Sequence, residues 1–211
     1  MGDRFSWKGH AGRALDTVDG SAVIDCDLCR FRHVVPLPAT ADLSQARNSD
    51  DPTAAAERIV FFERLWPDCR KRLLAVGTRL DSLVQQGERR GWSVCGVEPA
   101  AGDGALDSDL TPKLGVFDVV HVNGLLAHVP DPRDVLRLVF ALLEPRGLIA
   151  ATAPRAAGAL QPQRVNYFDV ASMQRLLGER FELHAGLVDG GTVMVVARKP
   201  ARRVMLGAGP A

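Results

Sequence analysis

Strand-like and helix-like segments alternate along most of the chain, and this alternation restricts the possible folds more than any other feature. Short apolar runs with the length of buried strands are separated by amphipathic stretches with the length of helices. Strands are expected at 72–77, 92–99, 116–123 and 148–154, helices at 80–91, 131–147 and 169–180, and a closing hairpin at 181–200. Such alternation requires crossover connections and a mostly parallel sheet, here with an antiparallel hairpin at its end. The sequence therefore predicts an α/β doubly wound fold.

The rest of the chain adds an arm, a first helix and a tail. Of the 211 residues, 46% are hydrophobic, which is enough for one well-packed domain. Residues 1–50 are expected to form an irregular N-terminal arm with a CxxC turn and at most one hairpin. Asp51 and Pro52 have the types that begin a helix, which should run over 52–66 and stop at Pro67. The predicted domain covers 51–199, and residues 200–211 are expected to form a flexible tail.

Charge and composition argue against several classes of partner. The 26 basic and 25 acidic residues give a net charge of +1, so no strong field favours nucleic acid or an anionic membrane. The sequence has no apolar run of membrane-spanning length, and its first ten residues lack the apolar core of a signal peptide. The four cysteines are too few and too scattered for a disulfide framework. We expect a soluble, cytoplasmic protein with reduced thiols.

Four stretches together resemble the class I S-adenosylmethionine-dependent methyltransferases. They are "RLLAVGTRLDSLVQQGERRGWSVCGVEP", "FDVVHVNGLLAHVPDPRDVLRLVFALLEPRGLIAATAP", "NYFDVASMQRLL" and "FELHAGLVDGGTVMVVARK". The resemblance covers about residues 55–199. It implies a Rossmann-like methyltransferase sheet, and S-adenosylmethionine as the cofactor if the protein is active.

The loop after the first strand departs from the family pattern, which is approximately D-x-G-x-G-x-G. Here Ala75 occupies the acidic position, Gly77 is retained, and Arg79 and Asp81 replace the next two glycines. In the family, the glycines let the backbone approach the cofactor and the acid meets its amino group. We expect the pocket above Gly77 to be empty or filled by protein, with Arg79 the first candidate to fill it. The alternative is a rerouted loop with Arg79 in solvent.

The second signature is better preserved. The resemblance places Glu98 where the family's carboxylate receives the two ribose hydroxyls, although Glu98 could equally be a helix-starting acid. Residues 100–117 are too few for the usual helix and third strand, so the sheet should be shortened at the edge beside the second strand. Asp107 or Asp109 could replace the adenine contact, or the segment could be a solvated loop. Asn123 completes the candidate cofactor contacts.

Candidate catalytic residues are sparse. The family often reads "LEHVPDP" after the third predicted strand, whereas this chain reads "LAHVPDP", with Ala127 and His128. His128 is the candidate general base, and the alternative is a role in capping the following turn. Tyr167 could line a substrate cavity, but core packing is the favoured interpretation.

The pair Cys26 and Cys29, followed by His33, has the spacing of half a zinc site. No second pair follows, and only Cys69 or His10 could complete the set by folding back. A turn with two small buried thiols is the favoured interpretation, and we assign no metal ligands.

Two functions remain in competition. The favoured one is a non-catalytic pseudo-methyltransferase without bound cofactor, supporting an active partner, because the losses concentrate on one ligand while the core pattern is intact. The alternative is an active methyltransferase acting on a small molecule, with Glu98 holding the ribose and His128 accepting a proton. The large apolar residues of the arm and the exposed sheet edge predict a homodimer, or a heteromer with a methyltransferase homologue.

Overall fold

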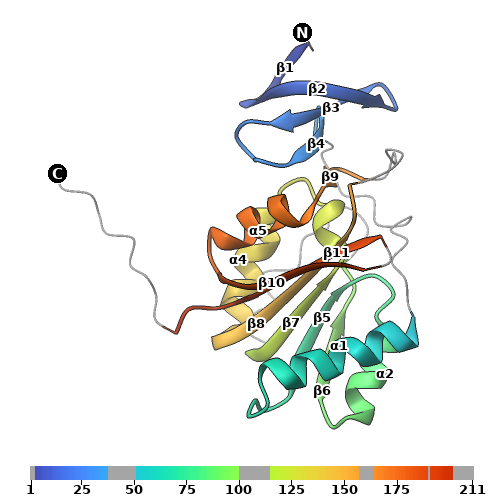
Figure 1. Ribbon diagram of the computed structural model, residues 1–211, viewed down its shortest axis with the longest axis vertical. Helices are drawn as coiled ribbons and strands as arrows, with labels where there is room; N and C mark the ends of the chain where they lie inside the picture. Colours follow the sequence, from blue (N-terminus) through green and yellow to red (C-terminus); the bar gives the residue numbers. More distant parts are fainter. Residues whose placement is uncertain (1–2, 38–50, 100–114, 157–163, 190, 202–211) are drawn as a thin grey trace, which may run out of the picture.

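The computed structural model describes residues 3–37, 51–99, 115–156, 164–189 and 191–201, and it contains two β-sheets (Figure 1). The larger sheet has the strand order β10-β11-β8-β7-β5-β6 within these residues. Its strands are β5 (Arg72–Gly77), β6 (Ser93–Val97), β7 (Phe117–Asn123), β8 (Leu143–Pro154), β10 (Glu182–Asp189) and β11 (Thr192–Arg198). The first four run parallel to one another, and β11 and β10 form an antiparallel hairpin beside β8. The predicted fold class is confirmed.

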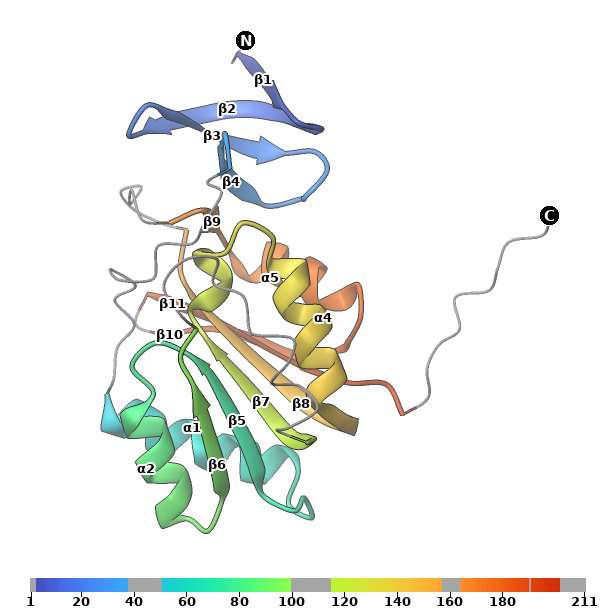
Figure 2. The same ribbon diagram turned by 180° about the vertical axis from the view of Figure 1, so that it is seen from behind.

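Helices cover both faces of this sheet (Figures 1 and 2). One face carries α1 (Pro52–Leu65) and α2 (Asp81–Arg89), and the other carries α4 (Pro132–Leu142) and α5 (Val170–Gly178). Because successive side chains of a strand point to opposite faces, neighbouring residues of β5 divide between the two cores. Leu73 and Ala75 pack beneath α1 and α2, whereas Leu74 and Val76 pack beneath α4 and α5.

Aspartate side chains cap the N-termini of three of the four α-helices in the described residues. Asp51 and Asp131 accept the backbone N–H groups of the second residues of α1 and α4, each followed by proline at the first helical position. The predicted helix over 131–147, with its end at Pro145, is too long. It stops at Leu142, and Leu143 already has the extended ψ of 138° that begins β8.

The N-terminal arm is a folded sheet, so the prediction of an irregular arm with at most one hairpin is wrong. Its strands are β1 (Arg4–Trp7), β2 (His10–Val18), β3 (Ser21–Cys26) and β4 (Arg32–Val35), all antiparallel. Two tight turns build it, Lys8-Gly9 and Asp19-Gly20, in which both residues have positive φ. That geometry matches the twist of a hairpin, and glycine or aspartate at these positions favours it.

The arm sheet is continued by β9 (Asn166–Tyr167) from the larger domain, in the order β1-β2-β3-β4-β9. Phe31 of the arm packs on Phe168 with ring centroids 5.0 Å apart. Tyr167 is buried against Val23 and Val34, which confirms the core-packing interpretation. The arm therefore folds onto its own domain.

The edge beside the second strand is only partly described. Within the described residues β6 is the edge strand, but the predicted shortening concerns 100–117, most of which lies outside them, as do Asp107 and Asp109. None of the helices described in the structure is long and apolar enough to cross a membrane.

Candidate functional site

The turn after β5 lies at the carboxyl end of the parallel strands, where ligands bind in open α/β sheets. Gly77 has φ 139° and pairs with Asn123 of the neighbouring strand β7. A Cβ added to Gly77 would lie 2.3 Å from the Asn123 carbonyl oxygen. The close approach of two strands therefore requires glycine here, whether or not a cofactor binds.

Arg79 adopts the left-handed conformation with φ 56°, where the family has its second glycine. Its side chain is exposed, which agrees with the alternative of Arg79 in solvent and not with Arg79 filling the pocket above Gly77. Its backbone N–H donates a 2.9 Å hydrogen bond to Oε1 of Glu98. Asp81, at the position of the family's third glycine, is the first residue of α2 and has no positive φ. The structure thus brings Arg79 and Glu98 together, and it directs one oxygen of the candidate ribose acceptor toward the loop.

Asn123 acts as a brace between the loop and the sheet. Its Nδ2 donates to the Thr78 carbonyl at 3.1 Å, and its Oδ1 accepts from the Thr152 hydroxyl at 3.1 Å. Asn123 and Thr152 are both buried, with 6% and 2% exposure. Thr152, at the end of β8, was not identified from the sequence, since an isolated threonine in a strand carries no motif.

His128 is buried at 3% exposure, at the end of the short 3-10 helix η2 (Leu125–Ala127). Its backbone N–H donates to the Leu125 carbonyl. Asn166 holds this segment by donating from Nδ2 to the carbonyls of Leu126 and Val129 at 2.9 and 2.7 Å. His128 therefore lies in a tightly packed segment, and a role as general base would require substrate to reach a buried ring.

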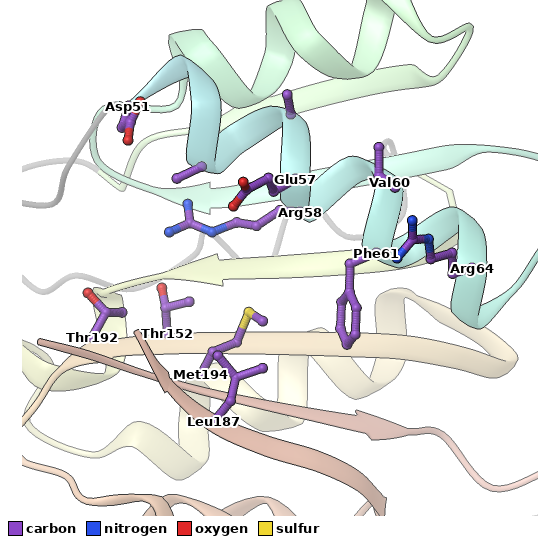
Figure 3. Close-up of a pocket in the computed structure, with 12 residues that line it drawn as sticks. Asp51, Glu57, Arg58, Val60, Phe61, Arg64, Thr152, Leu187, Thr192 and Met194 are labelled. Atoms are coloured by element: carbon purple, nitrogen blue, oxygen red, sulfur yellow. The ribbon is translucent and has the colours of Figure 1, made fainter. Parts of the chain in front are cut away.

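A groove of about 770 Å³ lies between α1 and the strands β8, β10 and β11 (Figure 3). Arg58 of α1 extends toward the strands, Thr152 and Thr192 lie at the same end, and Phe61 occupies the other. The volume is within the range of small-molecule sites. Thr152 lines this groove, and its hydroxyl also donates a hydrogen bond to Asn123. The groove therefore borders the side chain that braces the loop after β5.

A second group of candidate ligand side chains lies in the arm. One ligand atom from each of His10, Cys26, Cys29 and His33 falls within 4.8 Å of the others. Burial, together with the neighbouring Cys26, raises the pKa of the Cys29 thiol to about 12. Such a thiol is a poor nucleophile. The sequence had indicated three of these residues and left Cys69 or His10 open as the fourth, and the structure brings in His10.

Comparisons with known proteins agree with this architecture. The model of a methyltransferase domain family matches residues 47–184, and the chain belongs to that family. No curated protein matches the sequence significantly.

Solved structures show the same fold at low identity. The SAH-bound N-terminal domain of EvdMO1 is 21% identical, covers 74% of this chain and 83% of its own, and has a TM-score of 0.50. The glycopeptide N-methyltransferase MtfA complexed with S-adenosyl-L-methionine is 14% identical to this chain. The match covers 69% of this chain and 94% of MtfA, with a TM-score of 0.52. The [4+2]-cyclase SpnF is 14% identical to this chain. The match covers 79% of this chain and 89% of SpnF, with a TM-score of 0.50.

Proposed function

We propose that this protein is a non-catalytic methyltransferase-family subunit, a pseudo-methyltransferase that supports an active methyltransferase partner. The contact between the Arg79 backbone N–H and Glu98 carries the proposal. In the family, the loop backbone faces the cofactor and the acid receives the ribose. Here the backbone of the loop holds the acid, and an exposed arginine stands at the position of the family's second glycine.

The neighbouring positions support the same conclusion. Ala75 stands where the family's acid meets the cofactor's amino group, and it is fully buried among apolar side chains. Gly77, the one retained glycine, is explained by its contact with Asn123 and so gives no support for cofactor binding. The fold itself leaves the reaction open, because one fold hosts many chemistries.

Calorimetric titration of the full-length protein with S-adenosylmethionine and S-adenosylhomocysteine tests the proposal. We expect no binding tighter than about 100 μM, which corresponds to roughly −5.5 kcal/mol. The variant Ala75→Asp/Arg79→Gly restores two family features and serves as the matched comparison. Tighter binding by the wild-type protein would overturn the proposal, and a gain confined to the variant would assign the loss to these positions.

The partner half of the proposal has a separate test. The arm already packs on its own domain, so the described surface that remains for pairing includes the edge strand β6. We expect a dimer that buries at least about 1,200 Å². Light scattering at micromolar concentration should then give twice the chain mass of 22.8 kDa. Because the arm packs on its own core, a strict monomer would leave the proposal without its partner surface.

One observation favours an active methyltransferase as the second candidate. Arg79 keeps a positive φ where the family has glycine, so the loop still bends in a glycine-like way. The groove beside Thr152 is large enough for a small molecule, but His128 does not line it, so a substrate in the groove would still have to reach the buried His128 ring for the proton transfer. In that case S-adenosylmethionine binds in the titration, and methyl transfer to small acceptors depends on His128.

A further inference from the structure

Four side chains that suit a metal ion converge in the N-terminal sheet. One comes from the start of β2, two flank the turn after β3, and one comes from β4. We propose that the arm binds one structural Zn²⁺ ion through His10, Cys26, Cys29 and His33. This inference is independent of the proposed function and replaces the interpretation of the cysteines as two buried thiols in a turn.

The spacing of the ligand atoms fits tetrahedral zinc. With Zn–S near 2.3 Å and Zn–N near 2.0–2.1 Å, a tetrahedral ion separates a sulfur from a nitrogen by about 3.6 Å. Nδ1 of His10 lies 3.3 Å from Sγ of Cys29 and 3.8 Å from Sγ of Cys26. All four ligand atoms lie within 4.8 Å of one another, so small rotations would complete the tetrahedron.

His33 provides a separate observation. Its side chain is 1% exposed, and its Nδ1 contacts the Val34 carbonyl at 3.0 Å. A carbonyl only accepts, so Nδ1 carries the proton and Nε2 presents a lone pair. Within the described residues Nε2 has no hydrogen-bond partner although it is buried. A buried acceptor without a partner costs about 1–3 kcal/mol, and a metal ion would satisfy it. A backbone contact on the other ring nitrogen is the usual way to orient a histidine ligand.

The turn that holds the cysteines is already shaped for a metal. The backbone N–H of Cys29 donates to Sγ of Cys26 at 3.4 Å, and Arg30 takes φ 63° to close the turn. An N–H directed at a sulfur stabilises it as a thiolate ligand. Cys26 and Cys29 are 2% and 7% exposed, so both sulfurs lie inside the fold.

The ligand set selects the ion and its role. Two thiolates and two neutral imidazoles balance the charge of a divalent cation, which suits a buried centre. Sulfur and imidazole ligands in a tetrahedral arrangement favour zinc, and four protein ligands leave no position for substrate. The site is therefore structural.

The ion would also fix the arm to the domain. His33 pairs with Asn166 of β9, and Asn166 holds the carbonyls on both sides of His128. A cavity of about 360 Å³ lies where these parts meet, lined among others by Cys29, His33 and Arg133. Zinc would thus couple the order of the arm to the segment that carries His128.

Metal analysis of the full-length protein, purified without chelator, tests the proposal. We expect one zinc per chain, and binding weakened at least about tenfold in Cys29→Ser and His33→Gln. Cys69→Ser and His184→Gln are matched controls, because both residues lie outside the cluster. Both variant proteins should still bind one zinc per chain. Since ligand variants can unfold, cobalt substitution of the wild-type protein gives a second readout, with the absorption of tetrahedral Co²⁺ bound to two thiolates.

Three outcomes would overturn the proposal. The first is a metal-free protein that takes up neither Zn²⁺ nor Co²⁺ at micromolar concentration. The second is equal zinc loss in Cys69→Ser and Cys29→Ser. The third is a Cys26–Cys29 disulfide that persists in reducing buffer, because a stable structural disulfide leaves no thiolates to bind the metal.

Discussion

Replacing Gly77 by alanine should destabilise the protein strongly, and for a reason unrelated to cofactor binding. The φ of Gly77 is 139°, a region that residues with a side chain rarely adopt. The new Cβ would lie 2.3 Å from the Asn123 carbonyl oxygen and 3.1 Å from the Asn123 Cβ. The clashing atoms belong to the paired strand, so relief requires shifting β7 against β5.

The expected magnitude combines two effects. Backbone strain of this kind costs about 1–3 kcal/mol. Overpacking in a rigid interior adds about 1–3 kcal/mol. We therefore expect Gly77→Ala to lower the free energy of unfolding by about 3 kcal/mol, and the melting temperature by about 6–12 °C for a chain of this size.

Gly91→Ala is the matched control. Gly91 also has positive φ, 78°, but no atom lies within 4 Å of its added Cβ. Only the left-handed conformation is penalised there, by about 1 kcal/mol. Urea unfolding followed by tryptophan fluorescence gives both values in the absence of ligand. Equal losses in the two variants would refute the argument, since the contact with Asn123 would then contribute nothing.

Two further predictions concern titratable groups, the buried His121 and the exposed Asp169. Burial, with a smaller contribution from Arg58, lowers the pKa of His121 from 6.5 to about 3. The unfolded chain therefore binds the extra proton first, and stability should fall as the pH decreases from about 6.5 toward 3. His121→Leu should flatten that part of the urea-derived stability profile, whereas the exposed His184→Leu should leave it unchanged. Burial alone would raise the pKa of Asp169, but hydrogen bonds from Ser172 hold it below 3.8. Asp169→Ala removes this capping box and should cost about 1 kcal/mol above pH 4, with less effect as the pH falls below 3.8. An unchanged unfolding midpoint of Asp169→Ala at pH 7 would contradict this expectation.

The larger sheet was predictable because its central strands are buried on both faces and are therefore apolar along their length. The strand of 117–123, for example, is buried at every residue. In contrast, buried and exposed residues do not alternate regularly along β2, and Arg13, Asp16 and Thr17 are all exposed. Its hairpin was still readable from Asp19-Gly20, which is a strong two-residue turn signal.

The cluster of His10, Cys26, Cys29 and His33 depends on that same hairpin and on a bulge within it. Asp19-Gly20 closes the hairpin, and a register shift between Ala14 and Asp16 then places Gly12 opposite Cys26. His10 then lies beside the turn that follows Cys26, next to Cys29. The choice between His10 and Cys69 thus depended on recognising one hairpin and the bulge in its first strand.

Other parts of the site depend on contacts between segments far apart in the chain. The nearness of Gly77, Glu98 and Asn123 follows from the common carboxyl edge of parallel strands. The hydrogen bond from Arg79 to Glu98 depends on one residue's left-handed φ, which sequence patterns do not reveal in an arginine. The groove of Figure 3 joins α1 to the closing hairpin, more than a hundred residues later, so no local motif predicts it.

The retained and altered positions of the cofactor loop differ in what they contact. Gly77 and Asn123 are constrained by the sheet, through a close backbone approach and a buried hydrogen-bonded brace. Arg79 is exposed, so the rest of the fold places little restriction on its side chain. If cofactor binding no longer constrained this loop, the sheet-constrained residues would remain and the ligand-facing ones would drift. Gly77 and Asn123 fit that expectation, and so does the exposed Arg79, whereas Glu98 is retained although it faces the loop. Gly77 is therefore a marker of the fold, and the titration decides whether Glu98 still receives a ribose.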